Sequence, residues 1–258
     1  MCELLGMSAN VPTDICFSFS GLMQRGGATG PHKDGWGIVF YNGKGSREFR
    51  DDKPSSSSQV AKLVKQYPIK SDIVISHIRQ ANSGRICLEN THPFSRELWG
   101  RRWSFAHNGQ IKPVKKYPLK RYQPVGSTDS EHAFCWMLDA IQQQFPRKPP
   151  QGRVLFPVIH QLCRELNRFG VFNMLLSDSK YLFAYCATQL TWITRKAPFG
   201  EASLTDAELT VDFVRETTSK DIVTVISTQP LTGNETWNRM GREEMVVFKG
   251  GNLAARFI

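Results

Sequence analysis

The feature that most restricts the fold of this chain is the order of its apolar segments. Strand-like segments rich in β-branched residues stand on both sides of two central amphipathic patterns. The earlier group includes residues 72–79 (DIVISHIR) and 103–106, and the later group begins with a hairpin pattern at 171–186. We therefore expect an α+β fold. Two sheets with helices on their outer faces would bury these segments, and a simpler α+β arrangement fits the same pattern.

The central helices have recognisable beginnings. Residues 128–131 (TDSE) have the form of a capping box, and residues 154–169 form a second helix in which Pro157 is tolerable only near the first turn. Two more helices are expected, at residues 14–24 with Asp14 as the cap, and after the serines at 55–58. The remaining predicted strands are 3–9, 36–41, 191–194, 211–215, 221–227 and 245–248, and residues 103–106 are expected to end at His107-Asn108-Gly109.

Length and composition narrow the function classes. The 258 residues carry neither a linker nor an internal repeat, which favours a single domain over residues 1–258. No apolar run approaches the ~18 residues of a membrane-spanning helix. The beginning of the chain lacks the basic start and the apolar stretch of a secretory signal. We therefore expect a cytoplasmic protein without membrane contact.

Charge and cysteine usage exclude two further classes. A net charge of +10 could favour anionic partners, but the basic runs at 115–121 and 147–153 contain prolines and resemble solvated surface connections. No aromatic residues are interleaved with them in an RNA-reading pattern, which argues against nucleic-acid binding as the main activity. The six cysteines are scattered without zinc-site spacing, so we expect neither a metal nor another cofactor.

Cys2 has a position that none of the other cysteines shares. Removal of Met1 would leave a thiol and a free α-amine on one residue, with ordinary pKa values of ~8.5 and ~7.7–8. The amine could then accept the thiol proton, which activates the sulfur without a separate catalytic histidine. By itself the position is also compatible with an ordinary cysteine in a strand.

Seven segments extend this observation over most of the chain. In order they read MCELLGMSA, RGGATGPHKDGWG, SHIRQAN, ENTHPF, FAHNG, STDSE and STQPLTGNETW. With Cys2 in front of them, these segments resemble the class II glutamine amidotransferases, which are N-terminal-nucleophile hydrolases, and most closely their standalone YafJ-like group. The resemblance runs from Cys2 to Trp237. It implies a four-layer αββα sandwich with two mainly antiparallel sheets between helical layers.

The resemblance also implies a role for each matching residue. Cys2 corresponds to the nucleophile that forms a γ-glutamyl thioester. Arg79 corresponds to the residue that holds the substrate α-carboxylate, and Asp129 to the residue that receives the α-ammonium. Asn108 and Gly109 correspond to the oxyanion hole. Taken one at a time, these residues could also be a surface ion pair, a helix-capping acid and a tight turn.

Other residues qualify this assignment. The three histidines His77, His92 and His107 are interpreted as structural hydrogen-bonding residues, because the free amine removes the need for a histidine base. Larger synthases of the family have tryptophan directly after the pocket arginine, whereas this chain has Gln80. The identity of the γ-glutamyl donor therefore stays open.

Three functions remain after this reading. The first is cleavage of the γ-amide of glutamine, which releases glutamate and ammonia. The second is amide hydrolysis of γ-glutamyl peptides or conjugates, and the third is an inactive binding module of the same fold. The glutaminase-like domain takes up the whole length, so an ammonia acceptor would be a separate protein, or the enzyme is a simple hydrolase.

Overall fold

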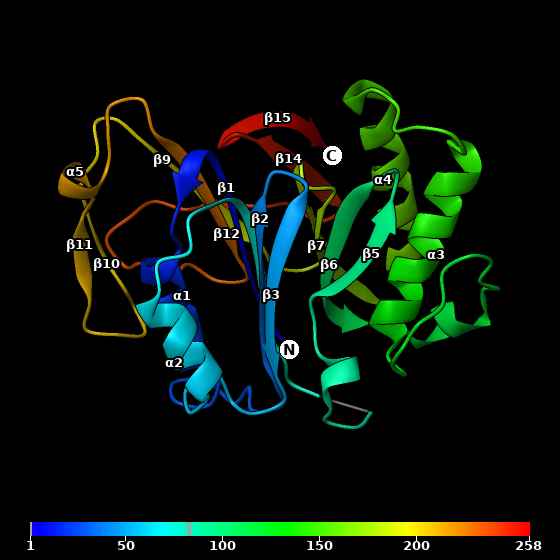
Figure 1. Ribbon diagram of the computed structural model, residues 1–258, viewed down its shortest axis with the longest axis horizontal. Coiled ribbons are helices and arrows are strands. Elements are labelled where there is room, and N and C mark those ends of the chain that lie inside the picture. Colours follow the sequence, from blue (N-terminus) through cyan, green and yellow to red (C-terminus); the bar gives the residue numbers. More distant parts are fainter. Residues whose placement is uncertain (1, 82–83) are drawn as a thin grey trace.

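Two antiparallel sheets lie face to face in the computed structural model, which describes residues 2–81 and 84–258 (Figure 1). The first sheet has the strand order β13 (Asn238–Arg239), β9 (Thr191–Lys196), β12 (Ile222–Ser227), β1 (Glu3–Thr13), β4 (Ser71–Ile78), β2 (Trp36–Asn42) and β3 (Gly45–Asp51). The second has the order β15 (Asn252–Phe257), β14 (Glu244–Lys249), β8 (Leu182–Cys186), β7 (Val171–Ser177), β6 (Arg101–Gln110) and β5 (Phe94–Leu98).

Helices cover the outer faces of both sheets. On the first sheet lie α1 (Cys16–Arg25) and α2 (Gln59–Gln66), and on the second lie the longer α3 (Asp129–Gln144) and α4 (Gly152–Asn167). A small two-stranded sheet of β10 (Glu201–Ser203) and β11 (Thr210–Asp212) stands beside α1, followed by α5 (Phe213–Glu216). Two short 3-10 turns are η1 (Leu88–Asn90) and η2 (Lys112–Lys116). The layers are therefore αββα, as the resemblance implies.

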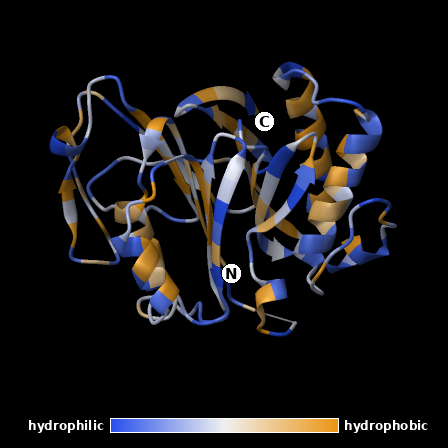
Figure 2. Cartoon of the chain, in the orientation of Figure 1, coloured by the Kyte–Doolittle hydropathy of each residue, from blue (hydrophilic) through white to orange (hydrophobic). Residues whose placement is uncertain are grey.

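The alternation of side chains along the strands divides the core into three layers. In β4, Val74 and Ile78 pack toward α1 and α2, whereas Ile73 and Ile75 pack between the sheets. A third cluster joins the second sheet to α3 and α4. Figure 2 shows hydrophobic residues along the strands and hydrophilic residues along the outer loops. Because both faces of the central strands are buried, their sequences read as nearly continuous apolar runs.

Two predicted helix beginnings are confirmed in detail. The Ser58 hydroxyl accepts the Ala61 amide at the start of α2, and the Thr128 hydroxyl accepts the Glu131 amide at 3.1 Å at the start of α3. The capping box is only half formed, however. The Glu131 carboxylate turns away from Thr128 and pairs with Arg96 at 2.6 Å.

Other predicted boundaries are wrong for local reasons. The predicted strand at 211–215 ends at Asp212, because the Asp212 carboxylate accepts the Val214 amide and begins α5. The strand predicted at 103–106 continues to Gln110, because residues 107–109 pair with β7. In α4, Pro157 lies in the second turn, since the helix begins two residues earlier than predicted.

The beginning of α1 also differs from the prediction. The helix begins at Cys16, and Ile15 takes the N-cap position without a side-chain bond. The Asp14 carboxylate still accepts the Cys16 amide, at 3.1 Å. No helix in residues 2–81 and 84–258 has the length and apolar character needed to cross a membrane.

Candidate active site

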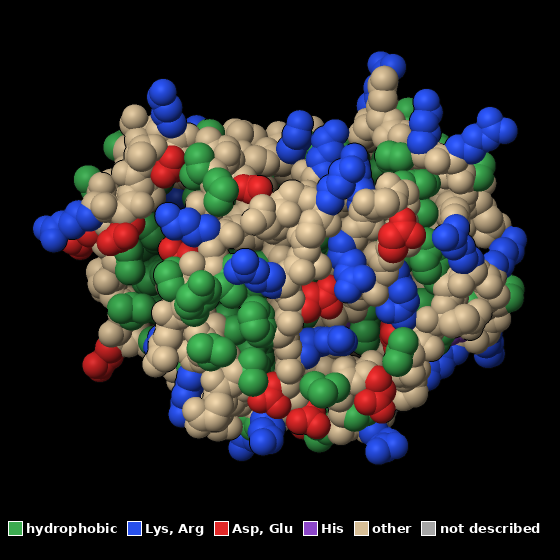
Figure 3. All heavy atoms as spheres, viewed as in Figure 1, with side chains coloured by type: hydrophobic (Ala, Val, Ile, Leu, Met, Phe, Trp, Pro, Cys, Tyr) green, Lys and Arg blue, Asp and Glu red, His purple; other side chains and the backbone are tan. Residues whose placement is uncertain are grey.

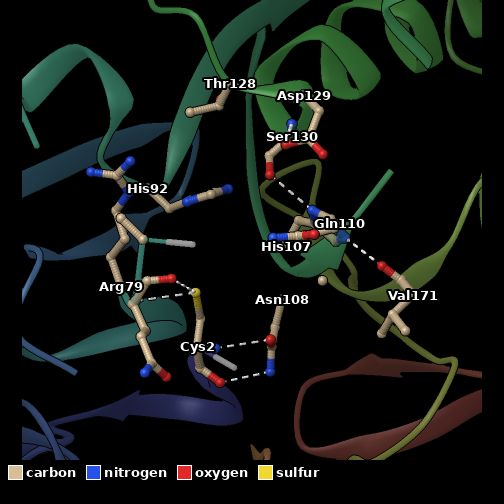
Figure 4. A pocket seen from close by; sticks show the side chains of 13 residues that line it. Cys2, Arg79, His92, His107, Asn108, Gln110, Thr128, Asp129, Ser130 and Val171 are labelled. Carbon is tan, nitrogen blue, oxygen red and sulfur yellow. Dashed lines mark hydrogen bonds between the residues drawn. The ribbon is translucent and has the colours of Figure 1, made fainter. Parts of the chain in front are cut away.

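A pocket of about 220 Å³ lies where β1, β4 and β6 meet the start of α3 (Figure 4). Its lining residues are Cys2, Arg79, Gln80, Ala81, His92, His107, Asn108, Gly109, Gln110, Thr128, Asp129, Ser130 and Val171. All five residues singled out from the sequence are among them, although they come from segments as far apart as residues 2 and 129. The structure therefore brings the predicted site residues together in one pocket.

The backbone of Cys2 is held on both sides by one amide side chain. The Cys2 N–H donates to Asn108 Oδ1 at 3.0 Å, and Asn108 Nδ2 donates to the Cys2 carbonyl oxygen at 2.6 Å. Asn108 is buried on β6 of the second sheet, whereas Cys2 precedes β1 of the first sheet. The two sheets are thus joined by hydrogen bonds at the residue that carries the sulfur.

The sulfur of Cys2 is surrounded by backbone groups. The Gln80 amide donates to Cys2 Sγ at 3.3 Å, and the thiol faces the Gln80 carbonyl oxygen at 3.5 Å. Burial raises the pKa of the Cys2 thiol, and the Gln80 amide and the positive charge of Arg79 only partly oppose this. The thiol is therefore protonated at neutral pH, so a nucleophilic role requires a base that removes its proton.

Arg79 is a buried cation that forms no ion pair with any described residue. Only 5% of its surface is exposed, and its Nη1 donates to the carbonyl oxygens of Arg85 at 3.1 Å and Asp34 at 3.5 Å. Among the described residues no carboxylate forms an ion pair with it. Arginine is seldom buried without a countercharge, so the guanidinium is arranged to receive an anion from outside the chain.

Asp129 supplies the opposite charge at the start of α3. Its Oδ2 accepts the Ile111 amide at 2.8 Å and its Oδ1 accepts the Ser130 amide at 3.0 Å. These bonds fix the carboxylate and leave lone pairs free, and no lysine or arginine of the described part pairs with it. A pocket with a free cation and a free anion suits the carboxylate and ammonium of an α-amino acid.

Glycine is the only residue type that fits at position 109. Its φ is +154°, and a Cβ there would overlap the carbonyl oxygen of Val171 on the neighbouring strand. The glycine therefore lets β6 approach β7 closely at the edge of the pocket. The alternative interpretation of Asn108-Gly109 as a tight turn is wrong, because both residues lie in β6.

One of the three histidines behaves as predicted. His107 Nδ1 lies 2.8 Å from the Ser130 hydroxyl, and its Nε2 lies 3.1 Å from the Val171 carbonyl oxygen. Both ring nitrogens are thus occupied by hydrogen bonds that join β6 to α3 and β7. The interpretation of His107 as a structural hydrogen-bonding residue is confirmed.

The same interpretation is wrong for His77 and His92. Their ring nitrogens have no hydrogen-bond partner among the described residues, and the two rings lie against each other with centroids 4.2 Å apart. The His92 ring also packs against Phe94, so aromatic contact takes the place of hydrogen bonding. Burial lowers the pKa of His77 to about 3 and that of His92 well below its ordinary value. Both imidazoles are neutral, and His92 faces the pocket.

Several pocket residues carry no sequence signal of their own. Val171 reaches the pocket because it pairs with Gln110 across β6 and β7, a register that local sequence does not reveal. Asp34 is outside the pocket lining, in the glycine-rich loop, and its carboxylate accepts the Ala81 amide at 2.7 Å. That bond fixes the segment after Arg79. Only the STDSE segment could have indicated Thr128 and Ser130, through their proximity to Asp129.

Comparisons with known proteins show which family this chain resembles. The family model described as "Glutamine amidotransferases class-II" matches residues 1–257. YafJ of Escherichia coli, classified by inference as a glutamine amidotransferase, is 61% identical over 248 residues, which cover 96% of this chain and 97% of that protein. A Haemophilus influenzae protein classified in the same way is 45% identical over 258 residues, covering 100% of this chain and 87% of its own length.

Solved structures give the same result for the fold. A glutamine amidotransferase homologue from Pseudomonas aeruginosa superposes with a TM-score of 0.79 at 54% identity, covering 98% of this chain and 100% of that one. The glutamine phosphoribosylpyrophosphate amidotransferase of Bacillus subtilis has a TM-score of 0.62 at 14% identity and covers 99% of this chain and 49% of its own. The second likeness concerns the sandwich fold alone.

Proposed function

The chain belongs to the class II glutamine amidotransferases, and from this premise we propose that it hydrolyses the γ-amide of glutamine through a thioester on Cys2. The observation that carries the proposal is the pocket in which the Cys2 sulfur lies with Arg79 and Asp129, neither of which forms an ion pair with a described residue. A single domain over residues 1–258 would supply all of these groups. No metal or other cofactor enters the proposed reaction.

Substrate recognition follows from the two free charges. Arg79 would hold the α-carboxylate through parallel N–H bonds, and Asp129 would accept the α-ammonium. Between them the side chain of glutamine extends toward Cys2. The volume of about 220 Å³ is below the ~300–1,000 Å³ of pockets for drug-sized ligands, which favours glutamine over a γ-glutamyl peptide.

Activation of the sulfur requires a base close to it. The buried thiol is protonated at neutral pH, and none of the described histidines hydrogen-bonds to it. Once residue 1 is removed, the Cys2 nitrogen becomes an amine on the same residue and can take the thiol proton. Residue 1 lies outside the described residues, so its removal is part of the proposal.

The chemical steps balance with this one base. The amine takes the thiol proton, the sulfur attacks the γ-carbonyl carbon, and negative charge develops on the oxygen. When the C–N bond breaks, the protonated Cys2 amine gives its proton to the leaving nitrogen. Ammonia then departs, and a γ-glutamyl thioester remains. Water then adds to the thioester with the amine as base. The C–S bond breaks, glutamate leaves and the thiol regains its proton.

The developing oxyanion would be stabilised by the Asn108 side-chain amide and the Gly109 backbone N–H. In the unliganded structure Asn108 Nδ2 donates to the Cys2 carbonyl oxygen, so the proposal requires this amide to turn toward the substrate or to share its two hydrogens. One lost donor of this kind costs ~2.7–4 kcal/mol of transition-state stabilisation.

The released ammonia needs a destination. The described residues are taken up by the sandwich and its connections, so the proposal sends ammonia to solvent or to a separate acceptor protein. A thiol nucleophile needs a reducing compartment, and the six cysteines are free, so we place the reaction in the cytoplasm.

The proposal is tested by removing the thiol at two positions. Cys2→Ala should abolish glutamate release from glutamine and labelling by a diazoketone analogue of glutamine. Cys163→Ala, which removes a buried thiol in α4 outside the pocket, should leave both unchanged. Full glutaminase activity of folded Cys2→Ala protein would overturn the mechanism. Faster turnover of γ-glutamyl peptides than of glutamine would change the proposed substrate but leave the thioester mechanism in place.

A further inference from the structure

A second cavity, of about 400 Å³, lies on the outer face of the first sheet. Its floor is formed by side chains of β1 and β12, namely Met7, Val223 and Val225. The start of α1 forms one wall, and the segment 199–217 forms the other. None of its lining residues belongs to the pocket that holds Cys2. The cavity is therefore a separate feature of the molecule.

The cavity exists because this sheet is covered incompletely. The helices over the second sheet have 16 residues each, whereas α1 has 10 and α2 has 8. The segment with β10, β11 and α5 covers the rest of the first sheet, as Figure 1 shows beside α1. Figure 3 shows hydrophobic side chains gathered on the surface over α1 and α2. The short helices and the segment with β10, β11 and α5 therefore leave an apolar space over the sheet.

The lining is mostly apolar and aromatic. Three phenylalanines, Phe17, Phe199 and Phe213, approach the cavity from α1 and from the covering segment. The Phe17 and Phe213 rings meet edge to face with centroids 5.6 Å apart. Such walls suit a flat hydrophobic body, because aromatic rings prefer stacked or edge-to-face contact.

Arg195 provides a hydrogen-bond donor within this apolar surface. Its side chain is 8% exposed, and its Nε and Nη2 bind the two Glu235 oxygens at 2.8 and 2.6 Å. The guanidinium carbon lies 4.8 Å from the Phe213 ring centroid. No described residue accepts a hydrogen bond from Nη1. Nη1 is not among the fully buried atoms that lack a partner, so it is accessible and can donate to a ligand in the cavity.

The charges of the lining determine the charge of that ligand. Lys65 and Arg195 are balanced by Asp14 and Glu216, and Glu235 already neutralises Arg195. The cavity therefore carries no excess of positive charge, and it does not attract phosphates or other polyanions. A buried ion pair offers its spare N–H to a neutral acceptor without the desolvation cost of burying another charge.

We propose that this cavity is a binding site for an uncharged, largely aromatic small molecule whose carbonyl-type acceptor pairs with Arg195. The volume of about 400 Å³ lies within the ~300–1,000 Å³ range of drug-sized ligands. The proposal is independent of the glutaminase function, because it shares no residue with that pocket.

The uncharged fluorescent ketone prodan tests the site directly. It combines a naphthalene body with one carbonyl acceptor, and its emission shifts to the blue in apolar surroundings. The native protein should bind one prodan per chain in a saturable way. Leu209→Trp, which enlarges a lining side chain, should weaken the apparent affinity at least about tenfold. Val214→Trp adds the same ring on α5 outside the lining and should leave the affinity unchanged.

Two further measurements separate this cavity from other sites. Saturating glutamine and the Cys2→Ala change should leave prodan binding unaffected, and a sulfonated naphthalene of similar size should bind more weakly. The proposal is overturned if native protein binds no prodan, if folded Leu209→Trp protein binds it as tightly as native protein, or if glutamine displaces it. Tighter binding of the sulfonate would overturn the assignment of an uncharged ligand.

Discussion

Replacement of Asn108 by alanine separates the structural role of this residue from its proposed role in the oxyanion hole. Its amide makes two hydrogen bonds to the Cys2 backbone, at 3.0 and 2.6 Å. Each such bond contributes about 0.5–1.5 kcal/mol, so Asn108→Ala should lower the free energy of unfolding by about 1–3 kcal/mol. Loss of an oxyanion donor costs ~2.7–4 kcal/mol in the transition state, so kcat should fall ~10²–10³-fold.

Asn173 offers a matched control for this experiment. It is equally buried, lies opposite Asn108 on β7, and makes five hydrogen bonds, to the Asn108 carbonyl oxygen, to Thr188 and to the amides of residues 187–189. Its side chain does not bond to Cys2. Asn173→Ala should therefore destabilise the fold at least as much as Asn108→Ala while kcat falls less than about tenfold.

The assay is steady-state glutamate release, read together with urea unfolding followed by circular dichroism. A large loss of kcat in Asn108→Ala that exceeds the loss in Asn173→Ala supports a transition-state role for the amide. The reasoning is refuted if folded Asn108→Ala protein keeps kcat within threefold of native, or if both variants lose kcat equally.

Three further predictions concern charge and burial. Arg79→Lys should raise KM for glutamine more than it lowers kcat, because lysine cannot form two parallel bonds to a carboxylate, and an unchanged KM in steady-state kinetics would contradict this. Arg25→Met should lower the free energy of unfolding by ~3–5 kcal/mol. The change removes the partner of Glu3, which pairs with Arg25 at 3.0 Å, and leaves a buried charge. A variant with nearly native stability in urea unfolding would disprove this prediction. The pKa of His77 is lowered to about 3 in the folded protein, compared with ~6.5 in the unfolded chain. The contribution of the neutral imidazole to the free energy of unfolding is therefore complete above pH ~6.5 and is lost as the pH falls toward 3. The loss is about 2 kcal/mol at pH 5, and His77→Phe should flatten the slope of unfolding free energy between pH 7 and pH 5 relative to native protein.

The residues of the candidate pocket could be predicted from the sequence, but most of their hydrogen bonds could not. The resemblance of their short segments to the motifs of the family predicts that Cys2, Arg79 and Asp129 share one pocket. Their partners depend on register between distant strands. The pairing of Asn108 with the Cys2 backbone joins residues 106 positions apart, and no local pattern encodes it.

The strands show a similar limit. The central strand β4 was predictable because burial on both faces makes its sequence continuously apolar. The edge strand β3 (GSREFRD) is not predicted, because four of its seven residues are charged and Phe49 is its one large apolar side chain. The strand predicted at 211–215 turns into the short helix α5 after Asp212, because the Asp212 carboxylate accepts the Val214 amide.

The stacking of His77 on His92 was also beyond sequence reasoning. The sequence predicts ordinary hydrogen bonds for both rings, because a free amine base leaves them without a catalytic role. Only the approach of the two segments that carry them buries both rings without partners. The sequence therefore predicts which side chains matter better than it predicts what surrounds them.

The central claim is that one residue supplies both the sulfur and the base. It is tested by comparing two preparations of otherwise identical protein, one with Cys2 as a free N-terminal residue and one with its α-nitrogen still acylated, each verified by intact mass. Glutamate release should occur only in the first, although both contain the thiol. Equal glutaminase activity in the acylated preparation would contradict the account.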